Sequence, residues 1–573
     1  MLKYFGMLQV ARASNTPPPP PLRVLVHGGP GTGKSYLAKK IDEEAQKIGI
    51  TTLGVAPTGV AAGNMSTQFR AGRTCAEALC IYDRTKEADD SAGNRVADRA
   101  LPDATTAQLA KMLATVDIKT LGLIIIDEVS YVGSTMFGHI DQRLRELLGN
   151  DLPFGGVAVM LMGDFFQLPP VCDTALYSSA VDMFLRAEHP PGAASTSAPP
   201  SERSTYLFET FSLWELWINE RAKDDPAHAE LLDLIRMAKP GSACEIAARI
   251  ARIRTLTAAD VRADGSWATT PVAVTSNPES QALAPVLSKA FARLHRRPRL
   301  TWRIPLGGKT AAALSASQTA YLYKQYGGAL TGYFVAGHNA YITDNINPSR
   351  RLANGTAVVL HSVELDERED AVRVADACAA AQEAGGDVEL RYPPRHINVE
   401  LPKEYAGLLG RRTLVPGGRV IPVGLPRFPD IHKLAVRPGG KKFKFVVKPH
   451  SIQLACGITV HKFQGRTCDK VVFDVNLRPG RMMSLGFHGL YVGLSRVRKQ
   501  SDLRFMPLQP GCFSLWHLER LGPSAELVSW LAGFGPTAPG GRRWQRGLAA
   551  AALAASAGTP ADPFLEPVAD QCG

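Results

Sequence analysis

The chain has 573 residues, of which 45% are hydrophobic and 21% are charged. At about 150 residues per domain this length implies two to four domains, and the apolar content excludes a wholly disordered chain. The formal charge of +12 is spread along the chain, so it indicates polyanion binding only where basic residues cluster. Nine scattered cysteines without a C-x-x-C pair argue against a zinc ribbon or a secreted disulfide framework and favour a reducing compartment. No apolar run approaches the roughly 18 residues that span a bilayer, so no membrane partner is expected.

The segment before residue 23 combines a short helical pattern with a proline run. Pro17 to Pro21 must be extended and predict a spacer. Gln9 lies on the helical pattern, and a glutamine upstream of a nucleotide-binding loop can contact the adenine edge. The alternative, an exposed helix residue without that role, stays open.

A short apolar strand, a glycine-rich turn and a helix follow in RVLVHGGPGTGKSYLAKKI, residues 23–41. This is the strand, G-x-x-x-x-G-K-[ST] and helix pattern of a P-loop; a turn that binds nothing is the weaker alternative. The glycines let backbone N–H groups face phosphate oxygens, and the helix N-terminus adds its dipole. Lys34 is expected to reach the β- and γ-phosphates, and the Ser35 hydroxyl to hold Mg²⁺. The predicted nucleotide-binding residues are Gly28, Gly29, Pro30, Gly31, Thr32, Gly33, Lys34 and Ser35.

Two carboxylates end the next strongly apolar run. A second strand and a turn with Thr58 and Gly59 come first, and a charge-rich loop at 83–106 and a helix at 107–116 follow. LGLIIIDEVS then shows the continuous apolar run of a buried parallel strand and ends in Asp127 and Glu128. Because such strand ends lie beside the P-loop, Asp127 is expected in the Mg²⁺ shell, and Glu128 is expected to orient and deprotonate the attacking water.

The following strand ends in GDFFQLPPV. Its Asp164 and Gln167 again lie at the carboxyl end of a parallel strand, where Gln167 is placed to sense the γ-phosphate. An ordinary turn closed by Pro169 and Pro170 is the alternative. From 185 to 204 the composition changes to Pro, Ala, Ser and Thr, which predicts a disordered insertion.

The order of several motifs resembles that of a known family. GGPGTGKS, IIIDEVS, GDFFQLPPV, the NGT at Asn354, ITVHKFQGRT and YVGLSRVR occur in this order in the PIF helicase family, the RecD-like branch of superfamily-one DNA helicases. The chain resembles this family over about residues 1–510. The resemblance implies an α/β fold with two RecA-like P-loop motor domains that close on one ATP, and a small SH3-like β-barrel inserted in the second.

This resemblance sets the expected domain boundaries. Residues 1–215 would form the first motor domain, and 216–351 with 449–510 the second. Residues 352–448 would form the inserted barrel, and 511–573 a C-terminal helix with a disordered tail.

The resemblance also assigns residues of the second motor domain. Arg221 would reach the γ-phosphate from that domain, and Arg496 would act across the cleft as an arginine finger. A solvated charge is the alternative for a lone arginine such as Arg221. The residues implied in the DNA path, or in coupling that path to ATP, are Thr58, Gly59, Asn277, Thr459, His461, Lys462 and Gln464.

Basic strands offer a further DNA contact. In KKFKFVVK the alternation places Lys442 and Lys444 on one face and Phe443 and Phe445 on the other. A wet face of a half-buried strand and a surface that follows DNA phosphates are equally compatible with this pattern. A second basic cluster lies at 293–303.

Two departures from the family pattern stand out. Ala76 and Glu77 replace a usual His-Ser pair, which puts one phosphate contact in doubt. Phe463 replaces a usual serine, which puts the DNA grip in doubt.

The resemblance implies an ATP- and Mg²⁺-dependent DNA helicase that moves 5′ to 3′ on single-stranded DNA, in repair, recombination or telomere maintenance. Its partners would be single-stranded DNA and 5′-tailed or structured duplex DNA, bound by a monomer that can dimerise on DNA. The expected location is the nucleus or mitochondrion in a eukaryote and the cytoplasm otherwise. The alternatives are a DNA-stimulated ATPase that separates no strands and an inactive mobile-element remnant, because the region before the P-loop is short.

Overall fold

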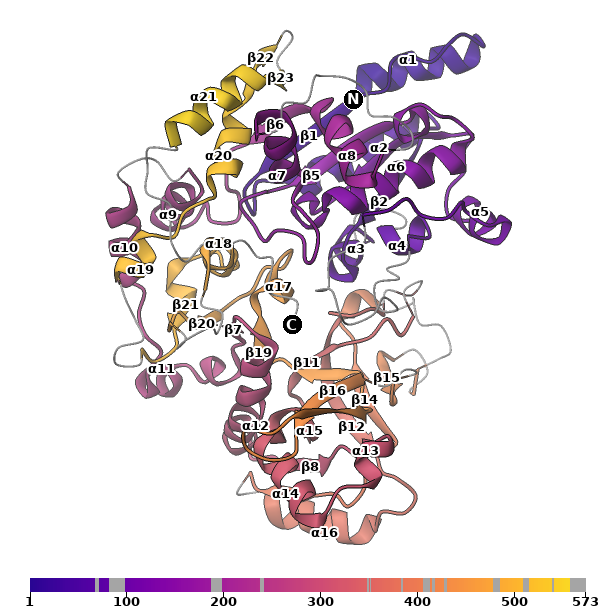
Figure 1. Ribbon diagram of the computed structural model, residues 1–573. Helices are drawn as coiled ribbons and strands as arrows, with labels where there is room; N and C mark the ends of the chain where they lie inside the picture. Colours follow the sequence, from indigo (N-terminus) through magenta and orange to yellow (C-terminus); the bar gives the residue numbers. More distant parts are fainter. Residues whose placement is uncertain are drawn as a thin grey trace.

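The computed structural model describes residues 1–66, 72–81, 98–186, 198–237, 242–347, 350, 352–382, 385–405, 413–414, 418–426, 430–477, 485–508, 515–537 and 541–556. Two α/β domains lie above a β-rich lobe, which Figure 1 shows at the bottom of the view. No described helix is long and apolar enough to cross a membrane. Six described cysteines are free thiols, whereas Cys172 is disulfide-bonded.

The first α/β domain is built on an eight-stranded sheet of order β22-β23-β6-β1-β5-β4-β2-β3. Strands β1 to β6 run parallel. The apolar runs predicted as buried strands are β4 and β5, and every residue in them is buried. Strand bounds are Arg23–Gly28 (β1), Thr51–Ala56 (β2), Arg73–Thr74 (β3), Leu121–Ile126 (β4), Ala158–Gly163 (β5) and Ser212–Leu216 (β6).

Helices cover both faces of this sheet, as the apolar strands require. Helices α1, α2 and α3 contribute to the core of one face, and α6, α7 and α8 to that of the other. Bounds are Leu2–Ala13 (α1), Lys34–Lys47 (α2), Gly59–Ser66 (α3), Cys75–Ala78 (α4), Thr106–Leu113 (α5), Ser134–Leu148 (α6), Leu176–Val181 (α7) and Pro200–Glu209 (α8). Because α8 begins at Pro200, the predicted disordered insertion is wrong for its last residues; 187–197 lie outside the described residues.

The second α/β domain has a parallel four-stranded sheet of order β19-β7-β20-β21. Its strands are Val272–Val274 (β7), Gly457–Thr459 (β19), Val471–Phe473 (β20) and Leu503–Phe505 (β21). Its helices are Pro226–Met237 (α9), Ala243–Ala251 (α10), Ala258–Ala263 (α11), Asn277–Leu294 (α12), Val460–Phe463 (α17) and Phe487–Leu494 (α18). One apolar core joins the two domains, because buried side chains of both belong to the same cluster.

The inserted lobe has its own core and three small sheets. That core runs from Leu300 to Cys456, so the lobe extends beyond the predicted 352–448 at both ends. All three sheets are open among the described strands, so the predicted closed SH3-like barrel is not confirmed. The strands are Arg299–Arg303 (β8), Leu306–Gly307 (β9), Thr331–Phe334 (β10), Asn339–Ile342 (β11), Ala357–Glu364 (β12), Asp387–Glu389 (β13), His396–Glu400 (β14), Val420–Val423 (β15), Asp430–Ala435 (β16), Lys442–Val447 (β17) and Ile452–Leu454 (β18). The helices are Lys309–Ala312 (α13), Ala316–Gln325 (α14), Gly327–Leu330 (α15) and Ala371–Gln382 (α16).

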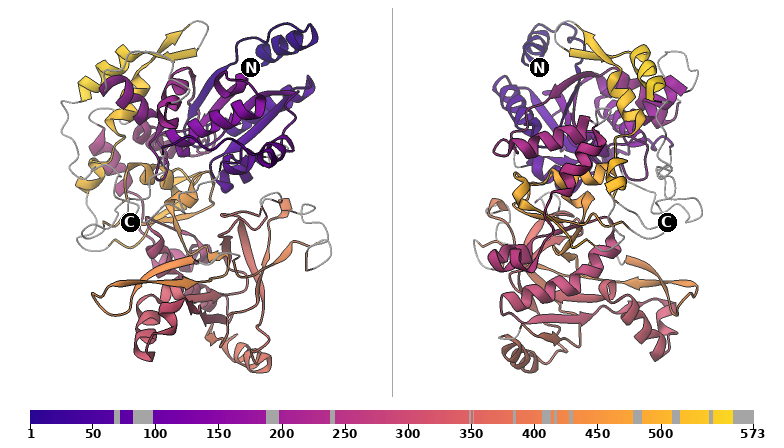
Figure 2. Two further views of the ribbon diagram at one scale, coloured as in Figure 1. Left: turned by 45° about the vertical axis from the view of Figure 1, so that its right-hand side comes forward. Right: turned by 90° about the vertical axis from the view of Figure 1, so that its left-hand side faces the viewer.

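The C-terminal segment returns to the first α/β domain. It forms α19 (Leu515–Glu519), α20 (Ala525–Ala532), β22 (Phe534–Thr537), β23 (Gly541–Trp544) and α21 (Arg546–Ser556). Strand β23 pairs antiparallel with β6, and Trp530 stacks on Phe208 at 5.3 Å. Both views of Figure 2 show this yellow segment against the first domain. The predicted disorder of the tail is therefore wrong up to Ser556, because buried aromatic side chains anchor it; 557–573 lie outside the described residues.

Candidate nucleotide and DNA site

The glycine-rich loop between β1 and α2 has the backbone that its sequence predicts. Gly31 and Gly33 have φ of 81° and 86°, the left-handed region that favours glycine. A Cβ on Gly31 would lie 2.4 Å from the Cβ of Arg221, so a larger residue would displace the adjoining chain. The Thr32 hydroxyl donates to the Gly29 carbonyl at 2.8 Å and closes the turn.

Lys34 lies half-buried beneath this loop. Its Nζ donates to the carbonyls of Gly28 at 2.6 Å and Gly29 at 2.9 Å. Burial lowers the pKa of Lys34, and the nearby carboxylates of Asp164 and Glu128 oppose that shift. The ammonium can therefore exchange two carbonyl partners for phosphate oxygens, which are stronger acceptors for a charged donor.

Asp127 and Glu128 follow directly after β4, as predicted. The Glu128 backbone N–H donates to Asp127 Oδ1 at 2.9 Å, and Glu128 has a left-handed φ of 53°, which is uncommon for a residue with a side chain. Burial, with the adjacent Glu128 carboxylate, raises the pKa of Asp127 to about 7. Asp127 thus lacks enough nearby positive charge to ionise easily.

Hard oxygen donors at this point fit a magnesium ion. The Asp127 carboxylate and the Ser35 hydroxyl are the ligand types that Mg²⁺ accepts, usually together with phosphate oxygens and water. The described residues contain no group of three or more His, Cys, Asp or Glu able to hold a metal without such help. The oxygen donors of Asp127 and Ser35 are of the kind that hold Mg²⁺ together with a nucleotide.

Gln464 of the second α/β domain reaches into the carboxylate site of the first. Its Nε2 donates to Glu128 Oε2 at 2.9 Å and to Ser130 Oγ at 3.2 Å, and its Oε1 accepts the Leu168 backbone N–H at 3.2 Å. The resemblance placed Gln464 in the motif that couples the DNA path to the ATP site and among the tentative DNA-binding residues. The structure places its amide on the predicted general base, Glu128.

The two predicted arginines, Arg221 and Arg496, lie beside this contact, and both donate hydrogen bonds to groups of the protein itself. Arg496, 1% exposed, donates to the carbonyls of Val492, Phe463 and Arg466 and to the Ser495 hydroxyl. Arg221 donates to the Ser495 carbonyl at 2.8 Å, and burial beside Arg496 lowers the pKa of Arg221 to about 9.

The predicted domain membership of Arg221 is wrong. Arg221 follows β6, and β6 belongs to the sheet of the first domain. Arg221 and Lys34 therefore belong to the same domain. Gln167, also predicted at the γ-phosphate, is buried, and its backbone N–H donates to the Asp164 carbonyl at 2.9 Å.

A buried polar cluster behind the loop was missed by sequence reasoning. His27 Nε2 accepts the Phe165 backbone N–H at 3.1 Å, and Arg236 Nη2 lies 3.0 Å from His27 Nδ1. The Tyr491 hydroxyl donates to Asp164 Oδ2 at 3.2 Å from the second domain. Burial and the charge of Arg236 hold the pKa of His27 well below its usual value, so the ring is neutral. The available signal was a polar residue interrupting an apolar run, as His27 does in β1.

Gln9 does not lie at the nucleotide loop. Its Nε2 approaches the Ile48 carbonyl at 3.4 Å, just beyond the last residue of α2. The loop opens the other end of this 14-residue helix, which is about 20 Å long at 1.5 Å per residue. The predicted adenine contact by Gln9 is therefore wrong, and the alternative of a helix surface residue holds.

The predicted DNA residues of the two domains border a contact with the inserted lobe. Thr58 Oγ1 accepts the Ala61 backbone N–H at 3.2 Å, and a Cβ on Gly59 would meet the Asn354 carbonyl at 3.4 Å. The next residue, Gly355, accepts a hydrogen bond at its carbonyl from Arg466 of the second domain. The NGT turn thus contacts both α/β domains.

The second domain contributes a further group at the carboxyl ends of its strands. Lys462 Nζ donates to Gln453 Oε1 at 2.6 Å, and the Tyr131 hydroxyl donates to the His461 carbonyl at 3.2 Å. Thr459 is buried at the start of α17, and Asn277 is exposed at the start of α12. These four predicted residues therefore lie at the same edge of their sheet.

The two departures from the family pattern differ in exposure: Phe463 is buried, whereas Ala76 is exposed and Glu77 is half-buried. Phe463 is 1% exposed within the core that joins the domains, so it packs rather than faces DNA. Glu77 bonds Arg73 at 3.2 Å beside β3, the edge strand of the sheet, next to Ala76 in α4.

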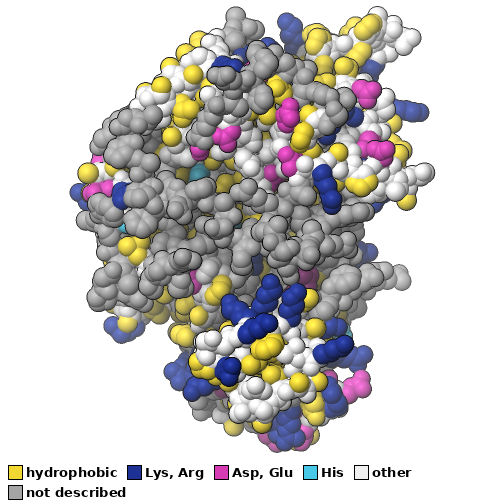
Figure 3. All heavy atoms as spheres, viewed as in Figure 1, with side chains coloured by type: hydrophobic (Ala, Val, Ile, Leu, Met, Phe, Trp, Pro, Cys, Tyr) yellow, Lys and Arg dark blue, Asp and Glu magenta, His cyan; other side chains and the backbone are white. Residues whose placement is uncertain are grey.

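The basic hairpin β16–β17 presents Lys442 and Lys444 to solvent, as predicted. Cross-strand pairing adds Lys433 opposite Lys444, so three lysines share the outer face. Phe445 and Leu434 point inward and are buried. Figure 3 shows dark-blue side chains gathered over this part of the lower lobe.

Part of the chain is similar in sequence to known ATP-dependent DNA helicases. Residues 20–188 match the family model of PIF1-like helicases. The ATP-dependent DNA helicase Pif1 of Psychrobacter is 29% identical over 149 residues, and PIF1 of Xenopus laevis is 33% identical over 149 residues. Each aligned segment covers 26% of this chain and 20% of the relative, so the chain aligns with about a fifth of these proteins.

Solved structures extend the likeness of fold to most of the chain. Bacteroides Pif1 bound to single-stranded DNA has a TM-score of 0.53 at 18% identity and covers 92% of this chain and 95% of that one. The complex of Bacteroides Pif1 with ADP-AlF3 and single-stranded DNA also scores 0.53 at 18% identity and covers 92% and 96%. The matched segment, residues 20–188, holds the phosphate loop and the strands β4 and β5 that lead into Asp127 and Asp164, so this part of the chain is similar to PIF1-like helicases.

Proposed function

We propose that this chain is an ATP-dependent DNA helicase that moves 5′ to 3′ on single-stranded DNA and unwinds duplex DNA. The observation that carries the proposal is the bond from Gln464 of the second domain to Glu128 of the first. It joins the carboxylate expected to activate water to a segment that also holds Thr459, His461 and Lys462. A change in the DNA path can therefore reach the hydrolysis site through one short segment.

The residues of the first domain supply binding and proton transfer. The N–H groups of the glycine loop and the Lys34 ammonium hold the β- and γ-phosphates, and Glu128 accepts the proton of the attacking water. Ser35 and Asp127 would hold Mg²⁺, which would offset the negative charge of the phosphates. Arg221 and Arg496 can stabilise charge on the transferred phosphoryl group once they exchange their Ser495 partners for phosphate.

Base-independent DNA binding follows from the proposed contacts. The lysines of the β16–β17 hairpin match the phosphate backbone, which carries charge but no sequence. Single-stranded and 5′-tailed or structured duplex DNA are the proposed partners. Monomer action with dimerisation on DNA, roles in repair, recombination or telomere maintenance, and a nuclear or mitochondrial location in a eukaryote belong to this proposal.

The test measures ATP turnover with and without single-stranded DNA, and strand displacement on duplexes with either a 5′ or a 3′ tail. We expect DNA to stimulate turnover and displacement to require the 5′ tail. Stimulated turnover without displacement on either tail would indicate an ATPase switch that separates no strands. Displacement only from a 3′ tail would refute the proposed direction.

A further inference from the structure

Because Gln9 lies at the far end of α2 from the phosphate loop, it cannot make the predicted contact with the base of a bound nucleotide. The sheet order indicates where the base must lie. Asp127 and Glu128 follow β4 on one side of β1, so the γ-phosphate and metal belong on that side. Strand β6 is the neighbour of β1 on the other side. A nucleotide whose phosphates lie in the loop therefore extends its sugar and base toward the end of β6.

The chain that follows β6 runs along the phosphate loop. The Glu220 backbone N–H donates to the Gly31 carbonyl at 2.9 Å, and a Cβ on Gly28 would lie 2.7 Å from the Leu216 carbonyl. Trp217 lies between these two contacts in sequence, and half of its side chain is exposed. An indole ring is thus held next to a phosphate cradle.

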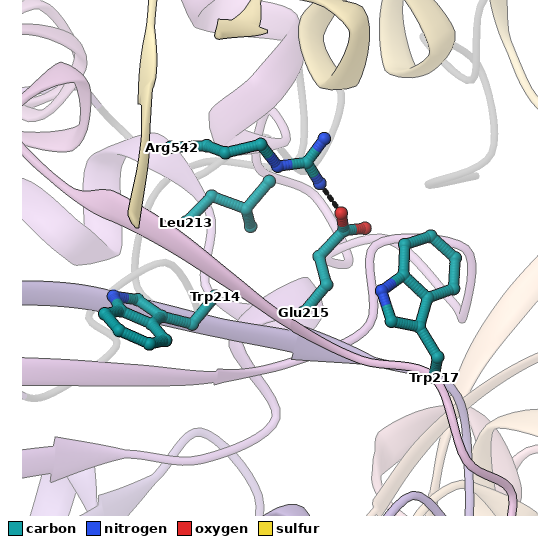
Figure 4. Close-up of a pocket in the computed structure, with 5 residues that line it drawn as sticks. All are labelled: Leu213, Trp214, Glu215, Trp217 and Arg542. Atoms are coloured by element: carbon teal, nitrogen blue, oxygen red, sulfur yellow. Dashed lines mark ion pairs between the residues drawn. The ribbon is translucent and has the colours of Figure 1, made fainter. Parts of the chain in front are cut away.

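The surroundings of Trp217 suit a planar aromatic ligand. Arg236 lies with its Cζ 5.4 Å from the Trp217 ring centroid, and its Cδ would be 3.7 Å from a Cβ on Gly29. Trp217 also borders a cavity of about 400 Å³ beside the Glu215–Arg542 ion pair. Figure 4 shows Trp217 near that pair, with Trp214 on the opposite side of the strand.

We infer that Trp217 is the stacking surface for the purine base of the bound nucleotide, and that Glu215 and Arg542 form the polar end of the base site. This inference rests on the proposed nucleotide-binding function. Glu215 offers acceptors and Arg542 offers donors for the polar edge of a purine. Because Arg542 comes from β23, the C-terminal segment would complete a site whose phosphate loop lies more than 500 residues earlier in the chain.

Affinities for ATP and for inorganic tripolyphosphate, which has no base, test the inference in the full-length protein. Stacking of one base is worth about 1–3 kcal/mol, so Trp217→Ala should weaken ATP binding by about fivefold to about a hundredfold. Tripolyphosphate binding should stay unchanged, and Trp217→Phe should recover most of the ATP affinity. Tyr36→Ala is the matched control, because Tyr36 is an exposed aromatic residue that lies in the first turn of α2 and not in the chain after β6.

The outcomes separate this inference from the proposed function. Equal weakening of both ligands by Trp217→Ala, or no weakening of ATP, would overturn the base site while leaving the phosphate loop intact. Loss of ATP affinity in Tyr36→Ala in place of Trp217→Ala would put the base on α2 and also overturn it. Absence of any binding of ATP or tripolyphosphate to the unmodified protein would remove the proposed function itself.

Discussion

Replacing Gln464 by alanine tests whether the second domain controls hydrolysis through Glu128. The change removes a donor to a carboxylate, and hydrogen bonds to charged groups contribute about 1.5–3 kcal/mol. At about 1.4 kcal/mol per factor of ten, DNA-stimulated turnover should fall by about tenfold to about a hundredfold. Affinity for a non-hydrolysable ATP analogue should change only a few-fold, because Lys34 and the glycine loop are untouched.

The isosteric change Gln464→Glu gives a second, pH-dependent readout. It puts a carboxylate next to Glu128, and two carboxylates in one place share a proton because both cannot ionise easily. At high pH the repulsion should depress turnover below that of Gln464→Ala. As pH falls, one carboxyl protonates and can donate again, so turnover relative to the unmodified protein should rise.

The assay is ATP turnover at saturating single-stranded DNA, measured with and without DNA. Gln142→Ala is the control, because Gln142 exchanges two hydrogen bonds with Leu101 in the first domain. Unchanged DNA stimulation in Gln464→Ala would refute the coupling. An equal loss of basal and stimulated turnover would show that Gln464 only positions Glu128.

Three further predictions address the loop, the metal ligand and the hairpin. Lys34→Ala should cut turnover at least about tenfold without lowering the unfolding temperature, measured by calorimetry; near-normal turnover would contradict the P-loop assignment. In the nucleotide-free native state the pKa of Asp127 is raised to about 7, whereas the same carboxyl in the unfolded chain loses its proton near pH 4. The native state therefore binds one more proton than the unfolded state between about pH 4 and about pH 7, and the free energy of unfolding falls as pH rises through this range. Asp127→Asn should flatten that part of the plot of unfolding temperature against pH, and an unchanged slope would refute the assignment. Replacing Lys433, Lys442 and Lys444 by glutamine should reduce the slope of log affinity for single-stranded DNA against log salt by about 2, at roughly 0.7 per phosphate contact; an unchanged slope would remove the hairpin from the DNA path.

Local patterns predicted the elements that depend on few residues. The glycines of the phosphate loop, the apolar run ending in Asp127 and the alternation in β17 each specify one element by themselves. The position of Gln9 could not be predicted in this way. It depends on how α1 packs against α2, and the periodicity of a helix does not indicate which end of its neighbour it meets.

The tail shows a second limit of local reasoning. Ala, Gly and Pro dominate its composition, which is typical of disorder, yet Trp530, Phe534 and Trp544 bury large side chains against the first domain. A few aromatic residues contribute more burial than the average composition suggests. Their partners, such as Phe165 and Phe208, lie more than 300 residues away, so no local window contains both halves of the contact.

Motif order predicted the positions of Arg221 and Arg496 only in part. Motif order predicted that both face the nucleotide from the second domain, but Arg221 belongs to the first, and Ser495 separates it from Arg496. Arg496 is held by carbonyls of α17 and α18, so it joins the helix that carries Tyr491 to the segment that carries Gln464. If Arg496 moved to bind a phosphate, its hydrogen bonds to the Val492 carbonyl of α18 and to the Phe463 carbonyl of α17 would break together. We therefore expect any movement of Arg496 toward the nucleotide to be coupled to the Gln464–Glu128 bond, because the same carbonyls hold both segments in place.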